Sequence, residues 1–298
     1  MTPSWLWALF TVFAAAGQTV RNTMQRKLTA DLGATGATQV RFLFGFPFAL
    51  AFLAGMALHG HQPLPATSPI FWFSDFVGAI GQILGTALML LLMEERSFVV
   101  ATAYIKTEPV FVAVFGLVFL GDLLTPGMML AIAICVAGVM VLSVDPKSGV
   151  GSPREAMLGL ASGAFFGISA IGFRGAILSL HDPDFVMAAT LTLTLGLFMQ
   201  AVLLTVWLAI RSPRVLRALL RLWRPSLLAG FMGALASEFW FLAFALVSAA
   251  SVRTLGLVDV IFAQGVSRFV FRHHTTPREY LGIAILLAGA ILLVVVHR

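Results

Sequence analysis

Charged residues are scarce in this sequence: only 11% of its 298 residues are Asp, Glu, Lys or Arg, whereas 59% are hydrophobic. A soluble globular domain carries about 25% charged residues, so the composition excludes a soluble enzyme or binding domain. We therefore predict an integral membrane protein with little mass outside the bilayer. The formal net charge of +6 predicts no nucleic-acid partner, because the basic residues lie in short connections between apolar runs.

Cysteine and metal-binding motifs are nearly absent. Cys135 is the only cysteine and lies within an apolar run, which excludes a disulfide framework and a thiolate metal cluster. The sequence contains no His-Glu-x-x-His pair and no Walker motif. It therefore predicts no cofactor and no metal, and it argues against a membrane metalloenzyme and against ATP-driven pumping within this chain.

Long apolar runs separated by short polar connections fill the whole sequence. Hydropathy and chain breakers give about ten segments, most of them long enough to cross a bilayer as a helix. We therefore predict an all-α integral membrane fold without a soluble domain. The ten predicted spans are approximately residues 5–24, 38–58, 74–93, 98–119, 128–144, 155–178, 185–210, 227–247, 252–271 and 278–296.

The second half of the chain repeats features of the first half. A shift of 151 residues places Glu108 on Asp259 and the Thr-Pro turn at 125–126 on a second Thr-Pro turn. Each half holds about five spans, an odd number, so the two units are predicted to have opposite orientations in the membrane. Inverted repeats of this kind hold the substrate between the halves of many transporters. The predicted units are residues 1–144 and 152–298.

The fourth predicted span combines charge with a helix breaker. Lys106, Glu108 and Pro109 lie within four positions of an apolar run. A charge at the middle of a membrane helix costs about 2.5–3.5 kcal/mol on insertion scales, so it usually faces a cavity or a partner. Pro109 cannot donate a backbone hydrogen bond, and a break in the helix is predicted there. Either a transport site or a purely structural Lys106–Glu108 pair fits this pattern.

One stretch of the first half combines a Pro-Val core, a Gly-acid loop and a Gly-rich closing helix: Glu108-Pro109-Val110-Phe111, Gly116, Gly121-Asp122, Thr125-Pro126 and residues 131–142. This order of features resembles the end of an EamA domain, and residues 282–293 repeat its closing helix. Tandem EamA domains are typical of the drug/metabolite transporter superfamily, whose ten-helix members include bacterial exporters of amino acids and metabolites. The resemblance implies two five-helix EamA repeats around a central cavity.

The sequence departs from the EamA pattern at three places. Asp122 stands where glutamate is usual, and Val260 stands where the second repeat would have its proline. The Gly-acid loop of the second repeat is replaced by residues 271–274. A helix break is therefore predicted at Pro109, whereas the ninth span carries no comparable signal.

The resemblance places the third, fourth, eighth and ninth helices around the cavity, with the first, second, sixth and seventh completing its walls. Glu108 and Asp259 would bind a substrate amine or a proton, or else they are counter-ions of Lys106 and of Arg253 or Arg268. Both alternatives remain open. The candidate substrate-binding and translocation residues are Gln82, Thr86, Tyr104, Lys106, Glu108, Glu238, Trp240 and Asp259.

A cavity with charges of both signs suits a zwitterion. The predicted function is that of a secondary transporter that exports amino acids or related small metabolites with broad selectivity by alternating access. The alternatives are an integral-membrane enzyme, a receptor or assembly protein, and an exporter of another metabolite or drug class. The resemblance implies a multi-pass protein of the bacterial inner membrane that acts as a monomer or homodimer in the lipid bilayer, with proton coupling as one energy source.

Basic residues are unevenly distributed between the two sets of connections. The connections around residues 59–69, 121–126 and 181–184 contain no Lys or Arg. The positive-inside rule therefore places both termini outside the cytoplasm, whereas the family resemblance implies cytoplasmic termini. The connection after the seventh span, which the rule places in the cytoplasm, carries Arg211, Arg214, Arg217, Arg221 and Arg224.

Overall fold

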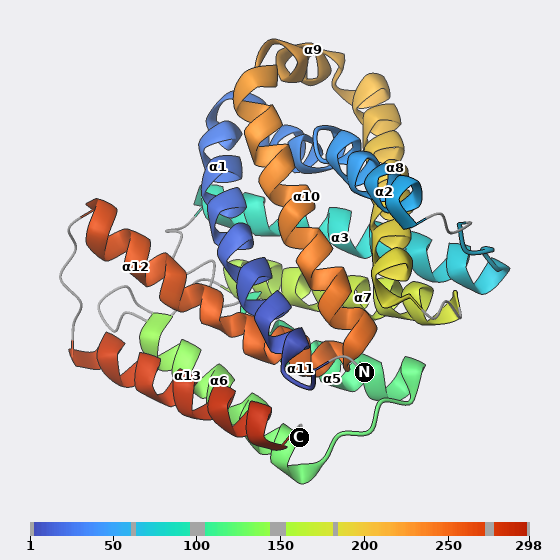
Figure 1. Ribbon diagram of the computed structural model, residues 1–298. Coiled ribbons are helices and arrows are strands. Elements are labelled where there is room, and N and C mark those ends of the chain that lie inside the picture. The colour runs from blue at the N-terminus through green and yellow to red at the C-terminus, as the bar shows by residue number, and fades with distance from the viewer. Residues whose placement is uncertain are drawn as a thin grey trace.

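The computed structural model describes residues 3–60, 64–95, 105–143, 153–180, 184–271 and 277–296, and within these ranges the secondary structure is entirely helical (Figure 1). This agrees with the predicted all-α fold. The elements are α1 (Leu6–Leu43), α2 (Phe46–Gly60), α3 (Pro69–Glu95), α5 (Glu108–Phe115), the π-helix η1 (Gly116–Leu120), α6 (Pro126–Ser143), α7 (Pro153–Ser179), α8 (Phe185–Arg211), α9 (Pro213–Arg221), α10 (Trp223–Leu246), α11 (Ala249–Leu255), the 3-10 helix η2 (Gly256–Val258), α12 (Asp259–Phe271) and α13 (Pro277–Val296).

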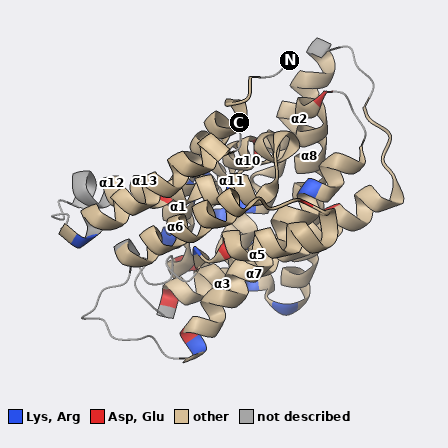
Figure 2. Ribbon diagram, turned by 90° about the horizontal axis from the view of Figure 1, so that it is seen from below, with Lys and Arg blue, Asp and Glu red and all other residues tan. Residues whose placement is uncertain are grey.

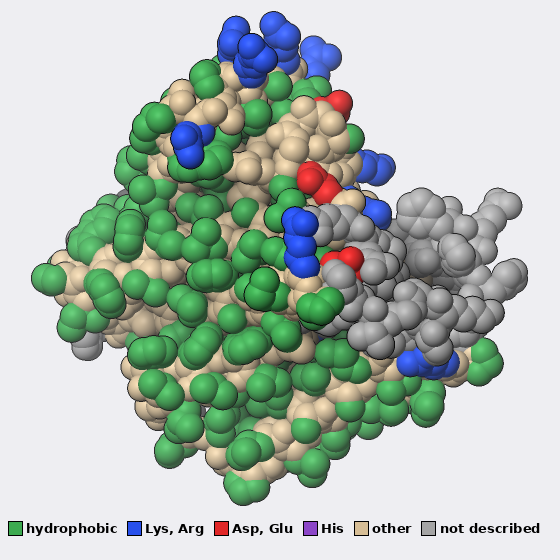
Figure 3. Space-filling view, turned by 180° about the vertical axis from the view of Figure 1, so that it is seen from behind, with side chains coloured by type: hydrophobic (Ala, Val, Ile, Leu, Met, Phe, Trp, Pro, Cys, Tyr) green, Lys and Arg blue, Asp and Glu red, His purple; other side chains and the backbone are tan. Residues whose placement is uncertain are grey.

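Apolar side chains are spread over much of the face shown in Figure 3. Lys and Arg side chains gather at the end of the molecule formed by α9, and charge is otherwise sparse on the ribbon (Figures 2 and 3). Within the described chain, five helical segments are long and apolar enough to cross a membrane: Leu6–Leu58, Pro69–Glu94, Pro153–Ser179, Phe185–Arg211 and Trp223–Leu246. Shorter apolar helices are Glu108–Leu120, Pro126–Val141 and Tyr280–Val296.

The first two predicted spans differ from the structure. A loop between residues 24 and 38 was expected, but α1 is helical from Leu6 to Leu43 except at Gly33, where φ is 65° and ψ is 171°. The chain turns at this glycine, and Gln25 Nε2 donates a hydrogen bond of 2.9 Å to the carbonyl of Ala37 beyond it. The polar composition of this stretch therefore reflects an interrupted helix rather than a loop.

The ninth predicted span also differs, because it is divided into α11, η2 and α12. In the fourth predicted span, residues 98–104 lie outside the described chain, and α5 continues into the π-helix η1. The remaining predicted spans correspond to α3, α6, α7, α8, α10 and α13 to within a few residues. Uninterrupted apolar helices and the break near Pro109 were thus predicted well, whereas the interruptions at Gly33 and at η2 were not.

Glycines allow the helices to pack at short range in three pairs: α1 with α10, α3 with α7, and α6 with α13 (Figure 1). A Cβ atom at Gly138 would lie 2.5 Å from the nitrogen of Leu286, and one at Gly289 would lie 2.7 Å from Cys135 Sγ. Both contacts join α6 to α13, and the two residue pairs map onto each other under the 151-residue shift. Small residues at such crossings let membrane helices approach closely.

The turn at Gly33 yields a first prediction. Its φ and ψ lie in a region that is essentially restricted to glycine, where another residue costs about 1–3 kcal/mol. Gly33→Ala should therefore lower the unfolding temperature of the purified protein in detergent. Gly55→Ala on α2 is the matched control, because a Cβ atom there would meet no atom within 4 Å. Equal unfolding temperatures for the two variants would contradict the assigned backbone conformation.

Candidate functional site

Two helices begin at carboxylates inside the molecule. Glu108 is the first residue of α5, after a turn at Lys106 and Thr107, and Asp259 is the first residue of α12, after the 3-10 helix η2. A carboxylate at a helix N-terminus is stabilised by the unpaired N–H groups and by the helix dipole. The structure therefore gives both carboxylates, which the repeat alignment pairs, the same local setting.

The two helix breaks have different causes. Pro109 is the second residue of α5, where its missing N–H removes no helical hydrogen bond. The break before Asp259 needs no proline. A Cβ atom at Gly256 would lie only 2.3 Å from Cη2 of Trp240, so the glycine lets the indole pack directly against the backbone of η2.

Each carboxylate pairs with a cation from the other half of the chain. Lys106 Nζ donates to Asp259 Oδ2, and Arg253 Nε lies 3.1 Å from Glu108 Oε1. The sequence was also compatible with an ion pair between Lys106 and Glu108. In the structure, these two residues pair with Asp259 and Arg253 instead. The ion pairs instead connect the segment before α5 with α12, and α5 with α11.

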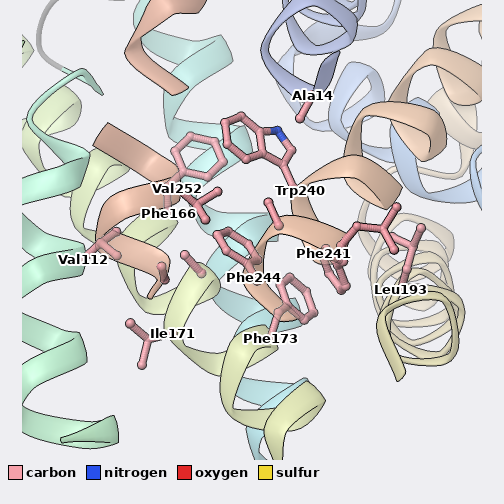
Figure 4. Close-up of a cluster of buried hydrophobic side chains, with 14 of the residues drawn as sticks. Ala14, Val112, Phe166, Ile171, Phe173, Leu193, Trp240, Phe241, Phe244 and Val252 are labelled. Carbon is pink, nitrogen blue, oxygen red and sulfur yellow. The ribbon is translucent and has the colours of Figure 1, made fainter. Parts of the chain in front are cut away.

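An aromatic cluster supports Arg253. Its guanidinium carbon lies 4.4 Å from the ring centre of Trp240 and 5.3 Å from that of Phe244. These two rings stack at 6.3 Å, and Phe241 continues the cluster toward Phe173 (Figure 4). A cation over aromatic faces gains attraction from the ring quadrupoles, so the cluster holds Arg253 in place beside Glu108.

Two further arginines, Arg21 and Arg41, come from the two arms of α1. In a straight helix, twenty residues would separate them by about 30 Å, but the turn at Gly33 brings both against α10. A Cβ atom at Gly233 would lie 3.3 Å from Arg41 Cγ and 3.4 Å from Arg21 Cδ. Both side chains are 2% exposed.

A cavity lies among these charged groups. The polar residues Gln18, Asn22 and Gln82 also line it, and Met89, Met93 and Phe166 supply apolar walls. Gln82 accepts a hydrogen bond of 2.9 Å from Gln200 Nε2, which fixes its amide. The charged lining residues are Arg21, Arg41, Lys106, Glu108, Arg253 and Asp259.

The structure brings five of the candidate residues together at the cavity: Gln82, Lys106, Glu108, Trp240 and Asp259. The others lie elsewhere. Thr86 Oγ1 is 3.5 Å from Arg41 Nη1, directly behind the lining. Glu238 points to a different neighbour, since Thr190 Oγ1 donates to it at 2.6 Å. Tyr104 lies outside the described residues.

The helix set that the resemblance implied around the cavity differs from the described lining at one helix. Every predicted span of that set contributes a described lining residue, with Arg41 coming from the second span, except the seventh span, which is α8. The largest share comes from α1. The α1 residues were missed although the sequence contains a signal for them. Gln18, Arg21, Asn22 and Gln25 recur at intervals of three and four and so form one polar stripe on a helix.

A second charged contact lies apart from the cavity. Arg174 of α7 donates to both oxygens of Asp122, at 2.7 and 2.9 Å, and its Nε donates to the carbonyl of Val247 at 3.0 Å. Gly121 precedes Asp122 with a left-handed φ of 68°, which turns the chain after η1 toward α7. The Gly-acid loop that carried part of the family resemblance is thus a structural junction between α7, η1 and α10.

The fold and site define a class: a helical, multi-pass membrane protein with a charged internal cavity. Residues 3–144 match the model of the EamA-like transporter family, in agreement with the resemblance found in the sequence. No curated protein matches the chain. A solved structure described only as "Crystal structure of protein" superposes with a TM-score of 0.71 at 12% identity, over 99% of this chain and 97% of that one.

The contact between Gly256 and Trp240 yields a second prediction. Gly256→Ala must displace the indole, because the new Cβ atom would lie 2.3 Å from it, and the displaced ring would no longer support Arg253. The variant should have a lower unfolding temperature and altered fluorescence. Gly265→Ala is the matched control on the following helix, since its Cβ atom would meet nothing within 4 Å. A Gly256→Ala protein as stable as the control would argue against this packing.

Proposed function

We propose that the protein is a secondary transporter that exports amino acids or related small metabolites through this cavity by alternating access. The observation that carries the proposal is the cavity beside the two interrupted helices, where charged groups from both halves of the chain meet. The family of residues 3–144 supports membrane transport as the general activity. The proposed location is the bacterial inner membrane.

The crossed ion pairs suggest how substrate binding would be linked to movement. Lys106–Asp259 and Arg253–Glu108 each join a residue of 1–144 to one of 152–298, the two proposed repeats. A substrate that interacts with any of these four groups weakens or replaces a contact between the halves. It can shift the conformational equilibrium by as much as its affinities for the two states differ.

The mixed lining favours small, charged substrates with varied side chains. Charged groups would fix the ends of the substrate, while Met89, Met93, Phe166 and Trp240 would contact its carbon atoms. Methionine adapts its shape to different partners, so the proposed selectivity is broad. Proton coupling is one energy source within this proposal, with Glu108 and Asp259 as the groups that would carry the proton.

Reconstitution in liposomes tests the proposed function. Glu108→Gln removes the counter-charge of Arg253, and leaving a buried cation unpaired costs about 3–5 kcal/mol. We therefore expect efflux of labelled substrates, screened with and without a pH gradient, to fall roughly tenfold or more. Glu238→Gln is the matched control, a half-buried carboxylate on α10 outside the cavity lining, and it should retain transport. Wild-type efflux in a folded Glu108→Gln protein would contradict the proposed site.

Membrane orientation gives a separate prediction. Arg217 on α9 and Leu123 after η1 are both exposed and lie in connections predicted to face opposite sides of the membrane. In a Cys135→Ala background, an impermeant thiol reagent should label Leu123→Cys in intact spheroplasts and Arg217→Cys only after permeabilisation. The reverse pattern would support cytoplasmic termini and would show that the basic connections do not set the orientation here.

A further inference from the structure

The charges that line the cavity do not balance. Its described lining contains four basic side chains and two acidic ones. Both acidic groups are already engaged, Asp259 with Lys106 and Glu108 with Arg253. Arg21 and Arg41 are therefore left without an acidic partner among the described residues, although each is 2% exposed.

Neutral groups satisfy only part of the hydrogen-bonding capacity of these arginines. Arg21 donates from Nε and Nη2 to Asn22 Oδ1 at 3.1 and 2.8 Å, and its buried Nη1 has no partner among the described residues. Arg41 Nη2 donates to Ser237 Oγ at 3.1 Å, and no residue in the described part of the chain bonds to its buried Nε. A hydrogen bond to a neutral oxygen orients a guanidinium but does not compensate its charge.

The two guanidinium groups also repel each other. The stems of both side chains lie over Gly233 of α10, so two like charges are held near one another away from water. Burying a charge is costly unless a counter-charge is supplied. Within the described chain no carboxylate forms an ion pair with either arginine, because Asp259 and Glu108, whose charges do attract Arg21, are paired with Lys106 and Arg253. This shortage of acidic partners indicates that the ligand supplies the counter-charge.

We propose that the transported molecule is a small organic anion, with more carboxylate or phosphate groups than ammonium groups, and that Arg21 and Arg41 bind its acidic group. This inference rests on the proposed transport function and narrows its substrate class. The planar guanidinium matches the oxygens of a carboxylate or phosphate through parallel hydrogen bonds. A zwitterion is less well suited, because its ammonium would have to share carboxylates that are already paired with Lys106 and Arg253.

The test uses the full-length protein with probes that differ in charge. Succinate and glycerol 3-phosphate represent carboxylate and phosphate anions, alanine is the zwitterion, and inorganic phosphate is the ion without a carbon skeleton. Binding is measured as the ligand-dependent rise in unfolding temperature in detergent, and transport as counterflow in phosphatidylcholine liposomes. We expect at least one organic anion to act at concentrations roughly tenfold lower than alanine, since a charged partner strengthens such hydrogen bonds.

Substitutions assign the preference to the arginine pair. Arg21→Gln and Arg41→Gln should each abolish the advantage of the anion over alanine. Arg174→Gln removes a half-buried arginine that is paired with Asp122 outside the cavity, so the advantage should persist. If the glutamine variants do not fold, Gly233→Val keeps both charges but displaces their stems, and it should weaken anion binding more than alanine binding.

The outcomes separate this inference from the proposed function. Equal or better binding and transport of alanine, or an anion preference that survives both glutamine variants, would overturn the inference while leaving transport intact. Binding of inorganic phosphate alone would also overturn it. Binding of succinate or glycerol 3-phosphate without counterflow of any probe would support the anion site and count against the transport function.

Discussion

A charge inside a membrane protein needs a partner within the protein, and this constraint shapes the centre of the molecule. Helix breaks at Lys106-Thr107 and at η2 place Glu108 and Asp259 at helix N-termini, where the helix dipole favours a negative charge. The same breaks bring Lys106 and Arg253 into range of the opposite carboxylates. Irregular backbone at membrane depth is tolerated where it lines a cavity or is buried in protein, and here it does both.

Glycine provides the close approaches that this arrangement requires. Gly33 lets α1 turn so that Arg21 and Arg41 reach the same place, and Gly233 leaves room for their stems. Because Gly256 has no side chain, the Trp240 indole can pack against its backbone, and the Arg253 guanidinium lies over this indole ring. Each of these glycines acts through a contact between segments far apart in sequence, so the cavity depends on helix packing as much as on its own polar residues.

This dependence explains what the sequence could and could not predict. Long apolar runs specify α3, α7, α8 and α10 directly, and Pro109 marks its helix break because the missing N–H is a local property. The break at Gly256 arises from tertiary contact with Trp240, for which no local pattern exists. Arg21 was overlooked because a basic residue near a predicted span end suggests an interfacial position, whereas its true surroundings depend on the turn at Gly33.

The cavity charges also differ between the halves in a way that bears on mechanism. The 151-residue shift relates Glu108 to Asp259, but it relates Lys106 to Leu257 and Arg253 to Thr102. The carboxylates thus follow the internal repeat while their cationic partners do not, and Arg21 and Arg41 both belong to the first half. If the two units are inverted repeats, the cavity opens to one side of the membrane when each unit has one conformation, and to the other side when the units exchange conformations. Because the cationic residues are not repeated, the charges around the cavity would differ between these two open states. The two open states would then differ in substrate affinity, and a difference of this kind sets how the conformational equilibrium responds to substrate on each side of the membrane.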